Sequence, residues 1–303
     1  EEAEGKAQTK ARLVVRQGGE TVADTGFAQL DSLAAPVEME LAPRTRYTWT
    51  VTVCTDAGEE AASDENWFET GKENEGWNAK WIGDSQARHP MYSKHIAPAK
   101  PVKSARLYIC GLGLYEAYYV PGKDAASAGS IETLRAEAKI GEELLAPYCN
   151  NYNEWVQYQT YDVTEKLKEE GDLCVLLGNG WYFGRFGFND PDGRPYYGKG
   201  RKLLAELRLT YEDGTEEAIG TDESWQVDYS SIFFSNIYDG EQMDDTLEPV
   251  AAAAAQVVEP PKGALTARRS LPVKALEELP VAELIHTPAG ETVVDLGQNI
   301  AGS

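Results

Sequence analysis

Glycine and aromatic residues are concentrated in one short segment, Leu177–Phe188, which reads LGNGWYFGRFGF. Glycine lets the backbone pass close to another segment, but it destabilises a helix interior by roughly 1 kcal/mol relative to alanine. We therefore predict a strand that ends in an exposed loop. One interpretation is a tight corner of a β-sandwich. The other is a sugar-binding surface, because aromatic rings have flat apolar faces and polar neighbours can bind the rim of a sugar.

The second interpretation defines a set of candidate carbohydrate-binding residues. They are the aromatic and amide side chains in and after this segment: Asn179, Trp181, Tyr182, Asn189 and Tyr197. For the aromatic rings, packing in a core or between domains is the alternative, so the sequence leaves both roles open. No histidine, nucleophile or glycine-rich phosphate loop stands in a catalytic pattern.

Charge and cysteine content restrict the partners and the compartment. The 303-residue chain has a formal net charge of −22, which argues against nucleic acid and against an anionic membrane surface. No apolar stretch approaches the roughly 20 residues that span a bilayer, and no signal peptide is recognisable. The four cysteines lack the paired spacing of a zinc site: Cys54, Cys110, Cys149 and Cys174. We expect reduced thiols and a cytoplasmic protein.

Short alternating runs predict a mainly β chain. Residues 45–55 read TRYTWTVTVCT, and this period of two is typical of a half-buried strand. Similar runs recur on both sides of a charged break at residues 72–76. A helix-prone stretch at about 120–138 and the alanine run 251–255 are instead predicted to be short helix or irregular linker. The runs after the break are 104–110, 114–120, 155–163, 172–178, 202–211, 217–221 and 224–229.

Seven pieces occur in an order that resembles the N-terminal region of bacterial α-L-rhamnosidases of the inverting glycoside hydrolase family. They are WFETG (67–71), WNAKWI (77–82), ARLYICGLGLYE (105–116), LAP (145–147) with YQTYDVT (158–164), LGNGWY (177–182), IYDGE (237–241) and VDLGQN (294–299).

The resemblance implies three consecutive β units. These are a fibronectin type III-like β-sandwich (1–72), a jelly-roll β-sandwich (73–263) and the start of a further β-domain (264–303). The stretch at about 120–138 is then an insertion where the family has a short turn.

The resemblance also implies that a different part of a longer parent protein carries out catalysis. Its catalytic unit would be an (α/α)6 barrel that hydrolyses terminal α-L-rhamnose. Inversion needs two carboxyl groups roughly 6.5–9.5 Å apart, and no acidic pair here stands in a recognisable motif. We therefore expect no catalytic residue in this chain. Its expected partners are a rhamnose-containing carbohydrate and the barrel of the same bacterial parent, with a purely structural or dimerisation role as the alternative.

Some jelly rolls of this kind resemble calcium-assisted rhamnose-binding modules. Asn189, Asp190 and Asp192 offer the hard oxygen ligands that calcium prefers, although a Pro-Asp-Gly turn explains the same residues without a metal. Asp239 and Glu241 likewise either bind a ligand or stabilise a turn.

Overall fold

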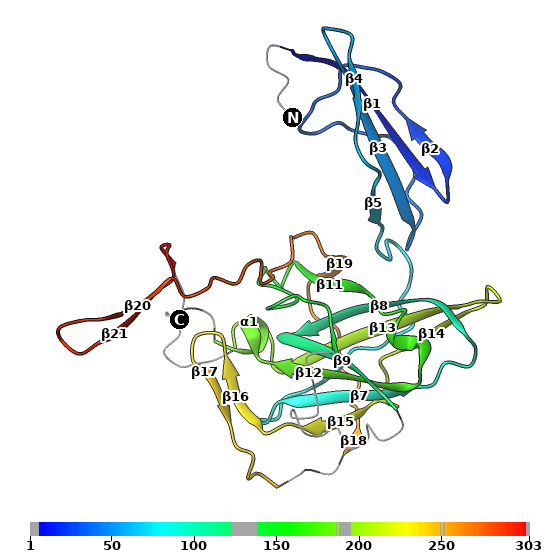
Figure 1. Cartoon of the computed structure of the whole chain (residues 1–303). Helices are drawn as coiled ribbons and strands as arrows, with labels where there is room; N and C mark the ends of the chain where they lie inside the picture. The colour runs from blue at the N-terminus through cyan, green and yellow to red at the C-terminus, as the bar shows by residue number, and fades with distance from the viewer. Residues whose placement is uncertain are drawn as a thin grey trace.

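The computed structural model describes residues 6–122, 138–185, 187, 195–248, 250 and 252–300. An N-terminal unit extends from a larger strand-rich unit, and a hairpin near the C-terminus projects from another side (Figure 1). The N-terminal strands form one sheet in the order β2-β1-β3-β4, with β5 also paired to β3. Their bounds are β1 Gln8–Gln17, β2 Glu20–Asp24, β3 Arg46–Thr55, β4 Glu60–Ala62 and β5 Asn66–Glu69.

The larger unit contains two six-stranded sheets. The first has the order β10-β9-β12-β7-β15-β18. Its strands are β7 Pro90–Ile96, β9 Leu114–Pro121, β10 Lys139–Ile140, β12 Gly171–Gly178, β15 Gln226–Tyr229 and β18 Ala253–Ala254. The second has the order β14-β13-β8-β11-β19, with β6 also paired to β13. Its strands are β6 Ile82–Asp84, β8 Val102–Leu112, β11 Trp155–Asp162, β13 Arg201–Tyr211, β14 Glu216–Gly220 and β19 Ala264–Ala267.

The main hydrophobic core lies between these two sheets. Leu173 and Val175 on β12 contribute from the first sheet, and Leu107 on β8 with Leu207 on β13 from the second. All four side chains are buried. Burial of apolar surface on the facing sides of two sheets is what stabilises a β-sandwich. The predicted mainly β fold is confirmed.

Pairing partners decide the structure of two segments after residue 250. Ala253–Ala254 forms β18 against β15, so the helix or irregular linker predicted for this part of the alanine run is wrong. Ala264–Ala267, assigned from the sequence to the following β-domain, forms β19 and pairs in parallel with β11. In both cases the backbone N–H and C=O groups pair with a neighbouring strand, and this pairing is not evident from the local sequence.

The remaining elements are short. They are η4 Lys166–Lys168, α1 Gly180–Phe183 and two hairpins, β16 Ile232–Asn236 with β17 Gly240–Met243 and β20 Glu283–His286 with β21 Thr292–Asp295. No helix within the described ranges is both long enough and apolar enough to cross a membrane. Residues 123–137, which hold most of the predicted insertion, lie outside the described residues.

A buried ion pair fixes the segment that joins the two units. Lys72 Nζ lies 2.6 Å from Glu206 Oε1 on β13, and both side chains are almost fully buried. The Lys72 backbone N–H donates to the Tyr158 hydroxyl at 2.7 Å. Glu69 at the end of β5 also pairs with Arg106 on β8 at 3.0 Å. The linker is therefore held against the second sheet by charged and hydrogen-bonded contacts.

Candidate functional site

The glycine- and aromatic-rich segment forms a tightly packed corner. As predicted, the strand β12 ends at Gly178, but the exposed loop expected after it is wrong: the single helical turn α1 follows, with Gly180 and Tyr182 buried. A Cβ atom on Gly113, in the β8–β9 turn, would lie 1.7 Å from the Asn179 carbonyl oxygen. Gly180 has a φ of +51°, which favours glycine. The glycines therefore permit two backbone segments to touch at this corner.

The aromatic rings of the corner pack against one another. Tyr182 is 5 % exposed, and its ring meets that of Tyr152 edge-on at 5.5 Å. Tyr152 in turn meets Tyr197 at 5.0 Å, and Trp181 packs against the same cluster. Burial raises the pKa of Tyr182 to about 12, so its hydroxyl stays protonated. Packing thus accounts for much of the surface of these rings.

The other candidate residues have separate environments. The Asn179 amide Nδ2 donates to Asn236 Oδ1 at 3.0 Å, which ties α1 to β16. Asp239 forms an ion pair with Arg185 at 2.7 Å, as expected for a residue that stabilises a turn. The proposed calcium ligands lie outside the described residues: Asn189, Asp190 and Asp192. Over the described ranges, no three His, Cys, Asp or Glu residues gather as a metal site would require.

Tyr182 and Tyr197 also line a cavity of about 570 Å³, which we call the inter-sheet pocket. It is defined by Asp84, Tyr92, Tyr182, Tyr197, Arg201 and Tyr229. Four of these residues come from the two sheets, where β6 and the start of β13 face β7 and β15, while Tyr182 lies on α1 and Tyr197 on the loop before β13. The segment after β18 helps to enclose the pocket, because Gly83 N–H donates to Gln256 O at 3.0 Å. The volume falls in the range of small-molecule sites, roughly 300–1,000 Å³.

A buried arginine forms the floor of the inter-sheet pocket. Arg201 is 2 % exposed, and its Nη1 donates to Asp84 Oδ1 at 3.2 Å and to Gln86 O at 3.1 Å. Burial lowers the pKa of Arg201 and raises that of Asp84, in each case against the attraction of the other charge. The Tyr92 hydroxyl and Arg201 Nε are buried without a hydrogen-bond partner. Such atoms are uncommon in folded proteins.

His89 lies beside this floor. Its side chain is buried, and Nδ1 lies 3.0 Å from the Leu177 carbonyl oxygen. Burial and the nearby charge of Arg201 lower the pKa of His89 to about 4. The imidazole is therefore neutral at pH 7, and Nδ1 is the nitrogen that donates to Leu177.

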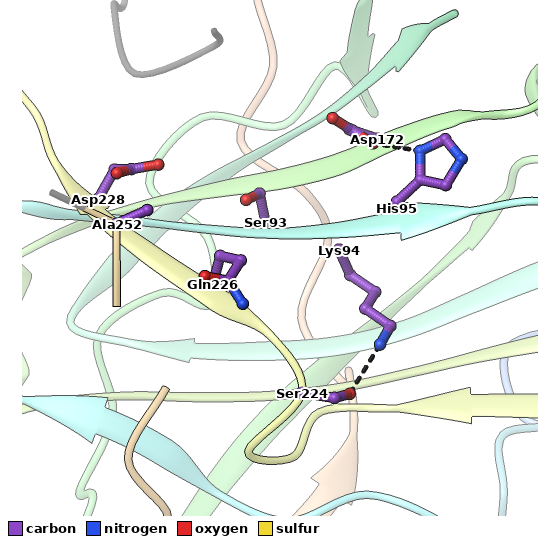
Figure 2. A pocket seen from close by; sticks show the side chains of 8 residues that line it. All are labelled: Ser93, Lys94, His95, Asp172, Ser224, Gln226, Asp228 and Ala252. Atoms are coloured by element: carbon purple, nitrogen blue, oxygen red, sulfur yellow. Dashed lines mark hydrogen bonds and ion pairs between the residues drawn. The ribbon is translucent and has the colours of Figure 1, made fainter. Parts of the chain in front are cut away.

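A second cavity, of about 520 Å³, lies on the outer face of the first sheet (Figure 2). His95 Nδ1 and Asp172 Oδ1, on the paired strands β7 and β12, are 2.6 Å apart. Figure 2 shows the His95 ring turned away from Ser93, so these three residues do not form the relay of a serine hydrolase. Burial raises the pKa of Asp228 on the other side of this cavity. The arrangement is polar but presents no activated nucleophile.

The residues of the inter-sheet pocket were only partly predictable. Tyr182 lies in the aromatic segment that the sequence singled out and Tyr197 follows it, whereas Tyr92 and Arg201 stand in no motif. Their strands are distant in the sequence and meet through sheet packing. A lone arginine at the start of a strand gives no signal of its burial.

The fold defines a mainly β class of protein whose larger unit is a sandwich of two sheets. Sequence comparison identifies the family to which the chain belongs. Residues 100–277 match the α-L-rhamnosidase N-terminal domain family, and residues 1–74 match the Rha78A-like N-terminal immunoglobulin domain. The chain belongs to the α-L-rhamnosidase N-terminal domain family. An immunoglobulin domain and the expected fibronectin type III-like unit are both β-sandwiches.

Individual relatives agree with this assignment. An α-L-rhamnosidase from Formosa agariphila is 29 % identical over 87 % of this chain and 30 % of its own length. One from Streptomyces avermitilis is 32 % identical over 72 % of this chain and 20 % of its own. The solved α-L-rhamnosidase from Aspergillus terreus is 27 % identical, with a TM-score of 0.76 over 97 % of this chain and 35 % of that one. This chain therefore spans about a third, or less, of the relatives' length.

Proposed function

We propose that this chain is the non-catalytic N-terminal region of an α-L-rhamnosidase that removes terminal α-L-rhamnose from glycosides. The observation that carries the proposal is the match to N-terminal domain families of these enzymes, together with a similarity to solved α-L-rhamnosidases over 97 % of this chain but 35 % of theirs. In this proposal the catalytic carboxylates lie in another part of a longer, bacterial and cytoplasmic parent, and the β units hold that part in place.

The hairpin β20–β21 supports the scaffold role. Among the described residues it pairs with no other strand, and its apolar side chains are exposed: Leu284, Ile285, Val293 and Val294. An isolated two-stranded hairpin is at best marginally stable in water. We propose that another part of the parent packs on this hairpin, with dimerisation as the alternative use of the same surface.

Activity measurements test the non-catalytic role. The chain should not hydrolyse p-nitrophenyl α-L-rhamnoside, whereas the longer protein that contains it should. Turnover by the purified chain, at a rate proportional to its concentration over several preparations, would contradict the proposal.

A second candidate function is carbohydrate binding, favoured because Tyr182 and Tyr197 line a cavity of suitable volume. Calcium held by Asn189, Asp190 and Asp192 would orient sugar hydroxyls beside the aromatic segment. Titration of L-rhamnose into the chain with calcium, and again with EDTA, tests this function. Heat of binding that disappears with EDTA supports the calcium site, and binding that persists with EDTA removes calcium from the proposal.

A further inference from the structure

The residues that line the inter-sheet pocket carry a net positive charge, whereas the whole chain is net negative. The chain has a formal net charge of −22. Yet the described residues that line the pocket include four cations and a single carboxylate, that of Asp84. The cations are Lys199, Arg201, Lys202 and Lys262. A cavity lined by one sign of charge concentrates ligands of the opposite sign.

Two of these four cations already interact with other groups of the protein. Arg201 is paired with Asp84. Lys202 Nζ donates to the Glu259 backbone carbonyl, and burial lowers the pKa of Lys202. Lys199 and Lys262 are exposed at the rim. Once Asp84 has balanced Arg201, the lining keeps an excess of positive charge that an anion can neutralise.

The same pocket has the surfaces that bind a sugar ring. Tyr182, Tyr197 and Tyr229 supply aromatic walls, and such rings pack on the apolar face of a sugar. The Tyr92 hydroxyl and Arg201 Nε lie behind these walls and are buried, so they do not contact a ligand directly. Aromatic walls and a basic rim together fit a sugar that carries a carboxylate.

We propose that the inter-sheet pocket binds the carboxylate-bearing ring of an acidic sugar within a rhamnose-containing carbohydrate. Lys199 and Lys262 bind the carboxylate at the rim, and the tyrosine rings contact the ring face. This inference rests on the carbohydrate-binding function proposed above and specifies its ligand class.

A matched pair of sugars tests the charge requirement. D-galacturonate and D-galactose differ by a carboxylate in place of a neutral hydroxymethyl group. Calorimetric titration of the whole chain at low salt should show galacturonate binding at least about tenfold more tightly. The advantage should shrink in 0.3 M NaCl, because salt screens exposed charges.

Variants locate the binding in this pocket. The double variant Lys199→Gln/Lys262→Gln should weaken galacturonate binding by about fivefold or more, as the loss of two partly exposed charge contacts predicts. Tyr197→Leu removes the aromatic face of a half-exposed lining residue, so it should weaken binding while the protein stays folded. Lys10→Gln, a change of the same charge in the N-terminal sheet, is the control and should leave binding unchanged.

Each other outcome overturns the proposal in a distinct way. Equal binding of galactose and galacturonate would contradict the preference for an acidic sugar but would still support carbohydrate binding. If neither the lysine variant nor the Tyr197 variant alters galacturonate binding, the binding belongs to another surface. Absence of binding for galacturonate, galactose and L-rhamnose removes both this inference and the carbohydrate-binding function.

Discussion

Lys72 and Glu206 form a buried ion pair across the junction of the two units, with Lys72 Nζ 2.6 Å from Glu206 Oε1. Burial opposes ionisation of Glu206. However, hydrogen bonds from Lys72, Arg208 and the Asn78 backbone N–H outweigh it, so the pKa of Glu206 is lowered. The rings of Trp77 and Tyr108 lie 5.0 Å and 5.5 Å from the Lys72 ammonium. The junction therefore depends on the charge of both residues.

Glu206→Gln should lower the free energy of unfolding by about 3–5 kcal/mol, because it leaves the Lys72 ammonium buried without a counter-charge. Urea denaturation measures the loss. The control is Glu223→Gln in the exposed Lys80–Glu223 pair, where we expect less than about 1 kcal/mol. If the double variant Lys72→Met/Glu206→Gln were no more stable than Glu206→Gln, the uncompensated charge would not be the cause.

Stability should fall in mild acid because of His89. Its pKa is about 4 in the folded chain and about 6.5 when unfolded, so the unfolded state takes up the proton first as the pH falls. The stability contributed by His89 is complete above pH 6.5 and is lost between pH 6.5 and 4. Linkage predicts a loss of about 2 kcal/mol between pH 7 and pH 5. His89→Gln should lack this part of the pH dependence in denaturation measured at both pH values, and an unchanged dependence would rule His89 out.

The contact between Gly113 and Asn179 predicts a strong effect of one methyl group. Gly113→Ala should cost about 3 kcal/mol or more, because the added Cβ would overlap a backbone carbonyl that cannot rotate away. Gly178→Ala is the matched control, since a Cβ there has no atom within 4 Å. Thermal unfolding of the two variants should separate them clearly. Equal melting temperatures would mean that the corner relaxes around the methyl group.

Burial distinguishes Tyr182, in the aromatic segment, from Tyr196, which follows the segment in the sequence. Tyr182→Ala should cost about 3–5 kcal/mol, because the ring is 5 % exposed and packs on Tyr152. Tyr196 is 66 % exposed, so Tyr196→Ala should change the stability by less than about 0.5 kcal/mol. Denaturant titration of both variants makes the comparison, and a small effect at Tyr182 would argue that its ring serves a ligand instead of the core.

The alternating strands were predictable because the alternation of apolar and polar residues indicates which face of each strand is buried. The run at 45–55 matches β3, and the run at 202–211 matches β13 to within one residue. By contrast, Pro90–Ile96 was not predicted, since proline, serine, lysine and histidine obscure the pattern. Its strand state comes from pairing with β12 on one side and β15 on the other. Ala253–Ala254 became a strand for the same reason, against the helix preference of alanine.

The site was predictable only where the residues cluster in the sequence. Tyr182 and Tyr197 could be selected because aromatic residues gather around them. Tyr92, Arg201 and Lys262 come from three distant segments, and their meeting depends on how the two sheets pack. Pairing between sheets is a property of the whole chain, and no local pattern encodes it.

The parallel pairing of β19 with β11 has a consequence for biosynthesis. Trp155 pairs with Ala264, so β11 leaves the ribosome long before its neighbour is made. At about 5–20 residues per second, the delay is roughly 5–20 seconds. During that time the outer edge of β11 presents unpaired N–H and C=O groups, which can recruit a strand from another nascent chain. Translation speed between these two strands thus sets how long the growing polypeptide is exposed to mispairing.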